Sequence, residues 1–134
     1  MNPAEFFKTI YLGDRGCKGV CIDGWNARAW VQVDEISRIR SETGSWDFYN
    51  DENIIDGLIV FTEVSSFALD PPGPVPNDWI EVEEVKPDEN GNFLFTFSLG
   101  AVDERGDSRE VMLRITAKSV HLEDPCRPGT HITT

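Results

Sequence analysis

The sequence contains few basic residues, few histidines and few cysteines, and it has no long apolar run. Its 134 residues include 12 Lys and Arg against 24 Asp and Glu, which gives a formal net charge of −12. A chain this acidic repels nucleic-acid phosphates and anionic membrane surfaces, because both are recognised largely through Lys and Arg. We therefore expect neither a nucleic-acid partner nor a membrane partner.

The shortage of apolar runs and of cysteine bears on the compartment. The longest apolar runs, such as 58–61, have only four or five residues, whereas a bilayer-spanning helix needs about 20. The N-terminal residues lack the basic and apolar regions of a signal peptide. Three cysteines, Cys17, Cys21 and Cys126, are an odd number and too few for a disulfide framework. These features predict a cytoplasmic protein whose residues 1–134 form a single domain.

The sequence also lacks the motifs of common catalytic and metal sites. There is no nucleophile elbow, glycine-rich oxyanion loop or phosphate-binding loop, and two histidines leave little choice of a general base. His121, Cys126 and His131 could compose a zinc site, but the usual C-x-x-C and H-x-x-x-H spacings are missing. We therefore predict no catalytic residues, no metal ligands and no cofactor. An enzyme that uses His121 with nearby carboxylates is the least favoured alternative.

The strongest positive signal is strand periodicity. From Cys17 onward, β-branched and aromatic residues alternate between turn signals. Short turns at Asp23-Gly24, Asn90-Gly91 and 105–107 would make neighbouring strands antiparallel. We expect six strands, near residues 17–23, 28–39, 57–69, 79–86, 92–102 and 110–122.

One expected strand and the connector that follows it have irregular features. Within 57–69, Glu63 and Ser65 interrupt a series of inward-facing apolar residues, as expected where a strand leaves the core. The connector 70–78 contains four prolines, each without an N–H group, and is therefore expected to be rigid and outside any ladder.

The N-terminus has the signature of a helix start. Asn2 can act as the N-cap, Pro3 as the first helical residue and Glu5 as the partner in a capping box. We expect a helix over 3–12 whose apolar stripe packs on the sheet, and a surface tail over 124–134. The predicted fold class is α+β, mainly β: an N-terminal helix on a twisted antiparallel sheet of about six strands, shaped like a half-barrel or sandwich.

The acidic charge is concentrated in one part of the chain. Residues 41–104 contain fifteen acidic residues and one base, Lys86. Such a surface fits a basic protein partner, although solubility alone can account for an acidic excess. Tryptophan and tyrosine in loops frequently anchor interfaces. The predicted partner-binding residues combine both features and are Trp46, Phe48, Tyr49, Trp79, Glu81, Glu83 and Glu84.

Two alternatives to this non-enzymatic binding protein stay open. The loop 46–56 has a dense set of side-chain oxygens and could serve a small-molecule or metal-binding domain. An open edge strand could also pair with a second copy of the chain and give a homo-oligomer.

Four segments, 46–49, 56–61, 70–78 and 113–122, make the chain resemble a group of small β-rich bacterial proteins. Most members are uncharacterised, and some similar proteins are classed as immunity proteins of polymorphic toxin systems. The resemblance covers roughly residues 45–122. It implies an antiparallel sheet and a bacterial cytoplasmic protein that neutralises a toxin by binding it. No functional residue follows from the resemblance.

Overall fold

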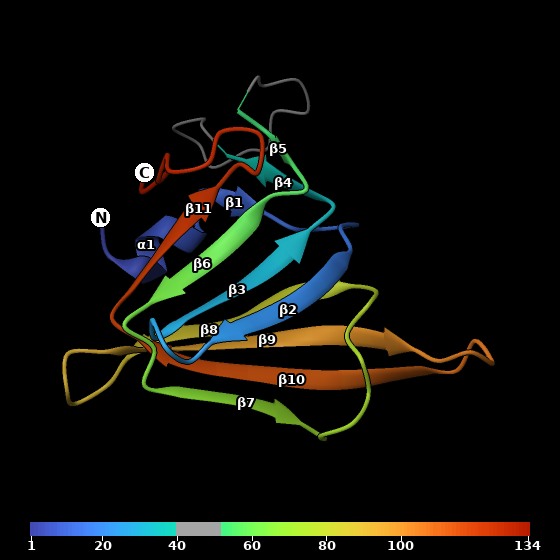
Figure 1. The fold of residues 1–134 in the computed structure, drawn as a ribbon. Coiled ribbons are helices and arrows are strands. Elements are labelled where there is room, and N and C mark those ends of the chain that lie inside the picture. Colours follow the sequence, from blue (N-terminus) through green and yellow to red (C-terminus); the bar gives the residue numbers. More distant parts are fainter. Residues whose placement is uncertain (40–51) are drawn as a thin grey trace.

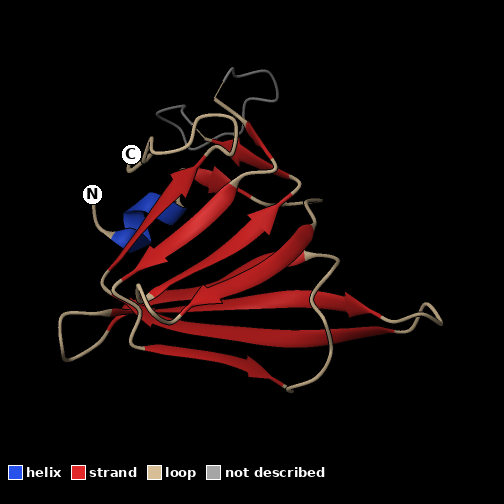
Figure 2. Ribbon diagram, in the orientation of Figure 1, coloured by secondary structure: helices blue, strands red, loops and turns tan. Residues whose placement is uncertain are grey.

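The structure, a computed structural model, describes residues 1–39 and 52–134. In this part of the chain the fold is mainly antiparallel β-structure (Figures 1 and 2). None of the helices described there has the length and hydropathy needed to cross a membrane. The elements are α1 (Pro3–Phe7), β1 (Ile10–Tyr11), β2 (Cys17–Asp23), β3 (Arg28–Val33), β4 (Glu35–Arg38), β5 (Ile54–Ile55), β6 (Leu58–Thr62), β7 (Ser66–Asp70), β8 (Ile80–Pro87), β9 (Phe93–Val102), β10 (Ser108–Ala117) and β11 (Ser119–Glu123).

The strands form two four-stranded sheets and one small sheet. The strand orders are β7-β10-β9-β8, β11-β6-β3-β2 and β1-β4-β5. Figure 1 shows the strands of the two large sheets running at an angle to one another, with the small sheet beyond one end of β3 and β6. The expected single sheet with a helix on it is therefore wrong, although the expectation of antiparallel β-structure is confirmed.

The two large sheets share one bent ribbon. β6 pairs with β11 through Thr62 and Ser119, and the same two segments continue as β7 paired with β10 through Ser66 and Thr116. Three residues, 63–65, therefore lie opposite only two residues, 117–118, of the paired segment. The extra residue forms a β-bulge, and Glu63 has the positive φ of 52° that such a bend requires. The sequence correctly located an interruption at this point, but the strand changes sheet there and does not leave the core, since Phe67 and Leu69 of β7 still pack against it.

Strand bends also explain why three expected strands are each divided in two. Segments 57–69 and 110–122 continue through the corner and change sheet, and in the second segment the buried apolar positions change there from odd numbers, ending at Ala117, to even numbers, starting at Val120. Segment 28–39 bends at Asp34, whose Oδ1 accepts hydrogen bonds from the N–H groups of Gly16 and Glu35, each at 2.9 Å. After this bend the chain joins the small sheet as β4.

The core lies between the large sheets and is rich in phenylalanine. Phe61 of β6 packs edge-to-face on Phe95 of β9, with ring centroids 4.9 Å apart. Phe7 of α1 lies 5.8 Å from both Phe95 and Phe97, so the short helix adds its side chains to the same cluster. Each such aromatic pair contributes about 0.5–1.5 kcal/mol beyond its buried area.

The helix is shorter than the expected range 3–12. The capping box is confirmed, since the Glu5 N–H donates to Asn2 Oδ1 at 2.9 Å and the Asn2 N–H donates to Glu5 Oε2 at 3.1 Å. The helix nevertheless ends at Phe7, because Ile10 and Tyr11 form β1 and pair with β4. Strand pairing thus outweighs the weak helical preference of this segment.

A buried arginine joins the small sheet to both ends of the chain. The Arg38 side chain is 1% exposed, and its Nη2 donates to Thr9 Oγ1 at 3.1 Å and to the Thr134 backbone oxygen at 2.8 Å. Its guanidinium carbon lies 5.8 Å from the ring centroid of Phe6. These hydrogen bonds offset part of the cost of burying the charge.

The proline-rich connector before β8 lies along β9. Asn77 Nδ2 donates to the Val102 carbonyl at 2.9 Å, and Asn77 Oδ1 accepts from the Val102 N–H at 2.8 Å. Trp79 then lies over Gly100, where a β-carbon would overlap the indole ring. The Trp79 Nε1–H donates to Ser98 Oγ at 3.3 Å. A glycine in β9 therefore determines where Trp79 lies.

We expect Gly100→Ala to lower the free energy of unfolding by about 1–3 kcal/mol, because the added methyl group displaces the indole. Urea denaturation followed by tryptophan fluorescence measures this loss. Gly24→Ala is the matched control, since no atom lies within 4 Å of its added methyl group. In a Trp79→Ala background the Gly100→Ala cost should nearly disappear, and an equal cost in both backgrounds would contradict the packing explanation.

Candidate functional site

The predicted partner-binding residues fall into two groups. Trp46, Phe48 and Tyr49 lie outside the described residues. The other four lie together, because Glu81, Glu83 and Glu84 belong to β8 and Trp79 immediately precedes it. The structure thus brings the second group onto one strand, and β8 is the candidate site.

The position of β8 makes its glutamates accessible. Among the described strands, β8 is the terminal one of its sheet, and its register partner there is β9. Glu81 lies opposite Ser98 and Glu84 lies opposite Thr96, so both side chains are on the outer face of the sheet. The register of the β8–β9 pairing shifts between Val82 and Glu84, and Glu83 is the residue of β8 that has no partner in β9 at this shift. All three glutamates are exposed.

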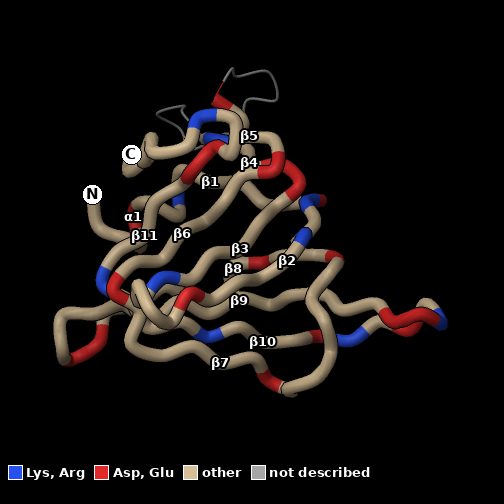
Figure 3. The backbone as a smooth tube through the Cα atoms, viewed as in Figure 1, with Lys and Arg blue, Asp and Glu red and all other residues tan. Residues whose placement is uncertain are grey.

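The charge of this strand is only partly neutralised. Lys86 Nζ lies 3.4 Å from Glu84 Oε1, which is an exposed and therefore weak ion pair. Among the residues that the structure describes, no cation forms an ion pair with Glu81 or Glu83. Figure 3 shows further acidic positions at the turns on both ends of β9. We call Glu81, Glu83 and Glu84 on β8 the acidic edge.

A hollow of about 530 Å³ lies beside the start of the acidic edge. Its walls include Tyr11, Arg15, Trp79 and Glu81. The Arg15 guanidinium is already engaged, since Nη1 lies 2.9 Å from Glu35 Oε2. Trp79 is half-buried against Gly100, so only part of its indole faces the hollow. The site therefore combines carboxylates with a fixed aromatic wall.

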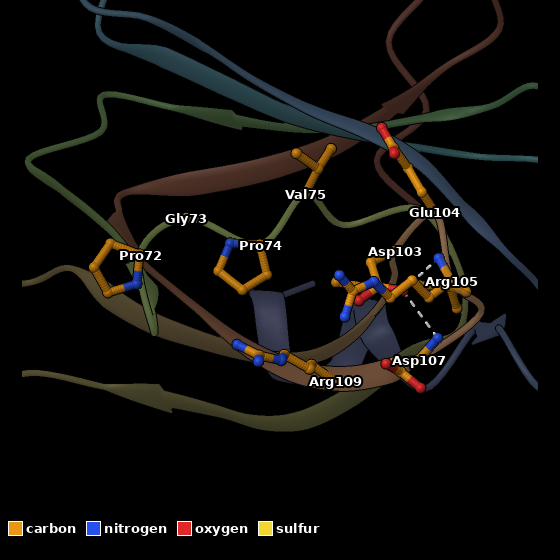
Figure 4. A pocket seen from close by; sticks show the side chains of 11 residues that line it. Pro72, Gly73, Pro74, Val75, Asp103, Glu104, Arg105, Asp107 and Arg109 are labelled. Carbon is orange, nitrogen blue, oxygen red and sulfur yellow. Dashed lines mark hydrogen bonds between the residues drawn. The ribbon is translucent and has the colours of Figure 1, made fainter.

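A larger hollow, of about 760 Å³, lies between the connector and the β9–β10 turn (Figure 4). Arg105 and Arg109 line it together with three acidic residues, so the lining does not favour a ligand of one charge. Asp103 Oδ1 accepts hydrogen bonds from the N–H groups of Arg105 at 2.9 Å and Asp107 at 3.0 Å. This carboxylate stabilises the turn, which is a structural role.

One exposed aromatic residue was not among the predicted site residues. Trp25, in the turn between β2 and β3, is 95% exposed, and Ile22 on β2 is 50% exposed. The Asp23-Gly24 turn signal could have identified Trp25, because the tip of a hairpin has no facing layer that could bury it. Figure 1 shows this turn at the same end of the molecule as the β8–β9 turn.

The three candidate zinc ligands do not all come together. His121 and His131 stack with ring centroids 3.9 Å apart, whereas the cluster of potential metal ligands around them contains Glu123 and not Cys126. His121 Nε2 lies 3.1 Å and His131 Nε2 lies 3.0 Å from Glu123 Oε1. Burial lowers the pKa of His121, and its hydrogen bond with Glu123 opposes this shift.

The loop 46–56 is described only from residue 52 onward. Within that part, Asp56 Oδ1 accepts a hydrogen bond from Lys18 Nζ at 2.7 Å, so this carboxylate is engaged by a cation of the protein itself. The oxygen ligands predicted at 47–51 lie outside the described residues.

These features define the class of protein: a small, mainly antiparallel β-protein with two facing sheets and an acidic edge strand. The chain belongs to the family of unknown function DUF6258, whose model matches residues 1–134. No curated protein and no solved structure shows significant similarity to it.

We expect two of the three thiols to react with Ellman's reagent in the native protein at about pH 8. Cys21 and Cys126 are exposed and free, whereas Cys17 is buried and free. Burial raises the pKa of Cys17 to about 11, so little thiolate forms there. The third thiol should react only after denaturation. Equal reaction rates for all three thiols in the native protein would contradict the burial of Cys17.

We expect the native state to lose stability as the pH falls below about 6.5, in part through His121. Because its pKa is lowered in the folded state, the unfolded state binds the proton first, and stability is complete above the unfolded pKa. Charged groups near the ring are Glu123, His131 and Arg28. Urea denaturation from pH 5 to 8 with a chelator present measures the dependence. His121→Gln should flatten it, and an unchanged slope would contradict this assignment.

Proposed function

We propose that this protein is a non-enzymatic binding protein whose acidic edge engages a basic protein partner. The observation that most strongly supports the proposal is that three exposed glutamates lie on the terminal strand of a sheet. The partner that fits this chemistry has an extended segment rich in Lys or Arg.

Strand addition is the binding mode that suits this geometry. The outer side of an edge strand presents backbone N–H and C=O groups that an extended segment can pair with. Side chains of the added segment would alternate, so Lys or Arg at every second position would face the glutamates on the outer face. Backbone pairing would supply affinity, and the charges would supply specificity and a fast association rate.

The aromatic wall beside the acidic edge favours a contact at the start of β8. An arginine or lysine that enters the hollow would meet the exposed part of the Trp79 ring and the carboxylate of Glu81. Cation–π contact with tryptophan contributes about 0.5–1 kcal/mol at an exposed site.

Self-association through β8 is less favourable than binding of a basic partner. An antiparallel pair of two β8 strands would place glutamates of both copies close together, and like charges in facing positions destabilise a sheet. The same charges attract a basic segment, so the acidic edge favours a hetero-complex over a homo-oligomer.

Two narrower forms of the proposal depend on the sequence. A toxin as the basic partner is suggested by the resemblance to immunity proteins. A cytoplasmic site of action is supported by the exposed free thiols of Cys21 and Cys126, which suit a reducing compartment.

The proposal can be tested by affinity capture. Tagged protein is incubated with a lysate of its native cells, washed at low salt and then eluted at high salt, and both fractions are identified by mass spectrometry. We expect a basic protein that is retained at low salt and released at high salt. Absence of a salt-sensitive basic protein would count against the proposal.

The identified partner then allows a test by mutation. We expect Glu81→Lys/Glu83→Lys to weaken binding about tenfold or more, because two attractive contacts become repulsive. Glu84 is left unchanged because Lys86 already pairs with it. Calorimetry or surface plasmon resonance measures the Kd of each variant.

The matched control is Glu89→Lys/Glu104→Lys, which makes the same change in net charge at exposed residues outside the acidic edge, in the β8–β9 turn and the β9–β10 turn. This control should bind almost as tightly as the unmodified protein. Equal weakening by both variants would show that net charge, and not the acidic edge, attracts the partner.

A further inference from the structure

The histidine pair at β11 is assembled from two distant parts of the sequence. His121 and Glu123 are two residues apart on β11, so their side chains point to the same face of the strand. The tail brings His131 to this face, because Ile132 and Leu122 exchange two backbone hydrogen bonds of 2.9 Å each. The three side chains therefore converge through backbone pairing that holds the tail against the strand.

The convergent atoms are all potential metal ligands. One carboxylate oxygen, Glu123 Oε1, lies 3.1 Å from His121 Nε2 and 3.0 Å from His131 Nε2. The donor atoms of all three residues lie within 4.8 Å of one another. Stacking at an interplanar angle of 18° makes the two imidazole rings nearly parallel, and both present Nε2 to the same oxygen.

We propose that His121, Glu123 and His131 form a binding site for a divalent transition-metal ion of the zinc class. In a tetrahedral zinc site with ligand distances of about 2.0–2.2 Å, neighbouring ligand atoms lie about 3.4 Å apart. The two N-to-O distances of 3.1 and 3.0 Å are shorter by only a few tenths of an ångström. Coordination also requires the lone pairs of both Nε2 atoms to point at the ion, so the exposed His131 ring would have to turn out of its stack on His121 as the ion enters.

The donor set selects the kind of ion. Two imidazoles and one carboxylate suit zinc and its neighbours, whereas calcium and magnesium prefer oxygen ligands alone. Three protein ligands leave a fourth position for water. The His131 side chain is 54% exposed and the His121 side chain is 7% exposed, so the open position lies on the tail side of the site.

The surroundings limit the affinity. Arg28 Nη2 lies 3.4 Å from Glu123 Oε1 and competes with an ion for this oxygen. One carboxylate and one nearby guanidinium leave the site without a net negative charge, so it should bind more weakly than four-ligand structural zinc sites. Each imidazole must also present an unprotonated Nε2 to the ion, which makes binding weaker at low pH.

Binding would have a structural consequence. The ion would cross-link β11 to the tail that carries His131, and a ligand that binds only the native state stabilises it. This consequence is independent of the acidic edge, because β11 and β8 belong to different sheets.

The test uses full-length protein from which any histidine tag has been removed. Titration with zinc chloride at pH 7.5 in a calorimeter measures stoichiometry and Kd, and thermal denaturation measures stabilisation. We expect one zinc ion per chain and a Tm rise of about 5 °C or more at zinc concentrations well above the Kd. No binding at concentrations up to about 1 mM would overturn the proposal.

Variants distinguish this site from adventitious binding. His131→Ala should lower affinity at least tenfold while preserving the fold, because its ring is largely exposed. Far-UV circular dichroism verifies the fold of the variant. Cys21→Ser/Cys126→Ser is the matched control that removes both exposed thiols, and it should bind zinc normally. Zinc binding by His131→Ala with undiminished affinity would overturn the assignment. Loss of zinc binding in the cysteine variant would also overturn it.

Cobalt substitution reports directly on the ligands. Cobalt bound to nitrogen and oxygen donors gives visible d–d bands without the near-ultraviolet charge-transfer band of a thiolate ligand. A thiolate band would instead identify a cysteine site and contradict the proposal.

Discussion

The bent ribbon formed by β6–β7 and β10–β11 is the constraint on which the rest of the structure depends. Each of its two segments belongs to one large sheet before the corner and to the other sheet after it. Hydrogen bonding continues through the corner, where the Lys118 N–H donates to the Thr62 carbonyl at 3.2 Å and the Ser65 N–H to the Thr116 carbonyl at 2.9 Å. The sheets therefore cannot move apart without breaking a continuous ladder. The bulge at Glu63 provides the change of direction.

The ribbon also determines which side chains meet in the core. Because the pairing registers on both sides of the corner are fixed, Phe61 on one sheet faces Phe95 and Phe97 on the other. A second link, the bridge between Gly16 and Trp79, joins the starts of β2 and β8. With the sheets held at two places, the apolar faces can be buried by side-chain packing alone, at about 1.5–3 kcal/mol for each large apolar side chain.

Local signals in the sequence predicted the strands and turns well, whereas the assembly of sheets required contacts between distant residues. The turn glycines Gly91 and Gly106 have positive φ values of 79° and 83°, as short hairpins require. The division at Lys118 was missed because each side of it alternates regularly, although the buried positions change there from odd numbers, ending at Ala117, to even numbers, starting at Val120. Exposure of the β8 glutamates follows from their charge, but the half-buried position of Trp79 depends on Gly100 in another strand. Convergence of His131 on Glu123 depends on the return of the tail, for which the sequence has no local pattern.

The terminal strands β8 and β11 are protected from unwanted pairing in different ways. The tail covers β11 through the pairing of Leu122 with Ile132, whereas β8 presents glutamates. Charged residues on an edge strand discourage aggregation whether or not a partner exists. This protective role requires only that some charge be present and places no demand on its sign. A partner-binding role requires negative charge at these positions in particular. The concentration of one sign over 41–104, with Lys86 as the single base, is the charge pattern that the proposed basic partner would require.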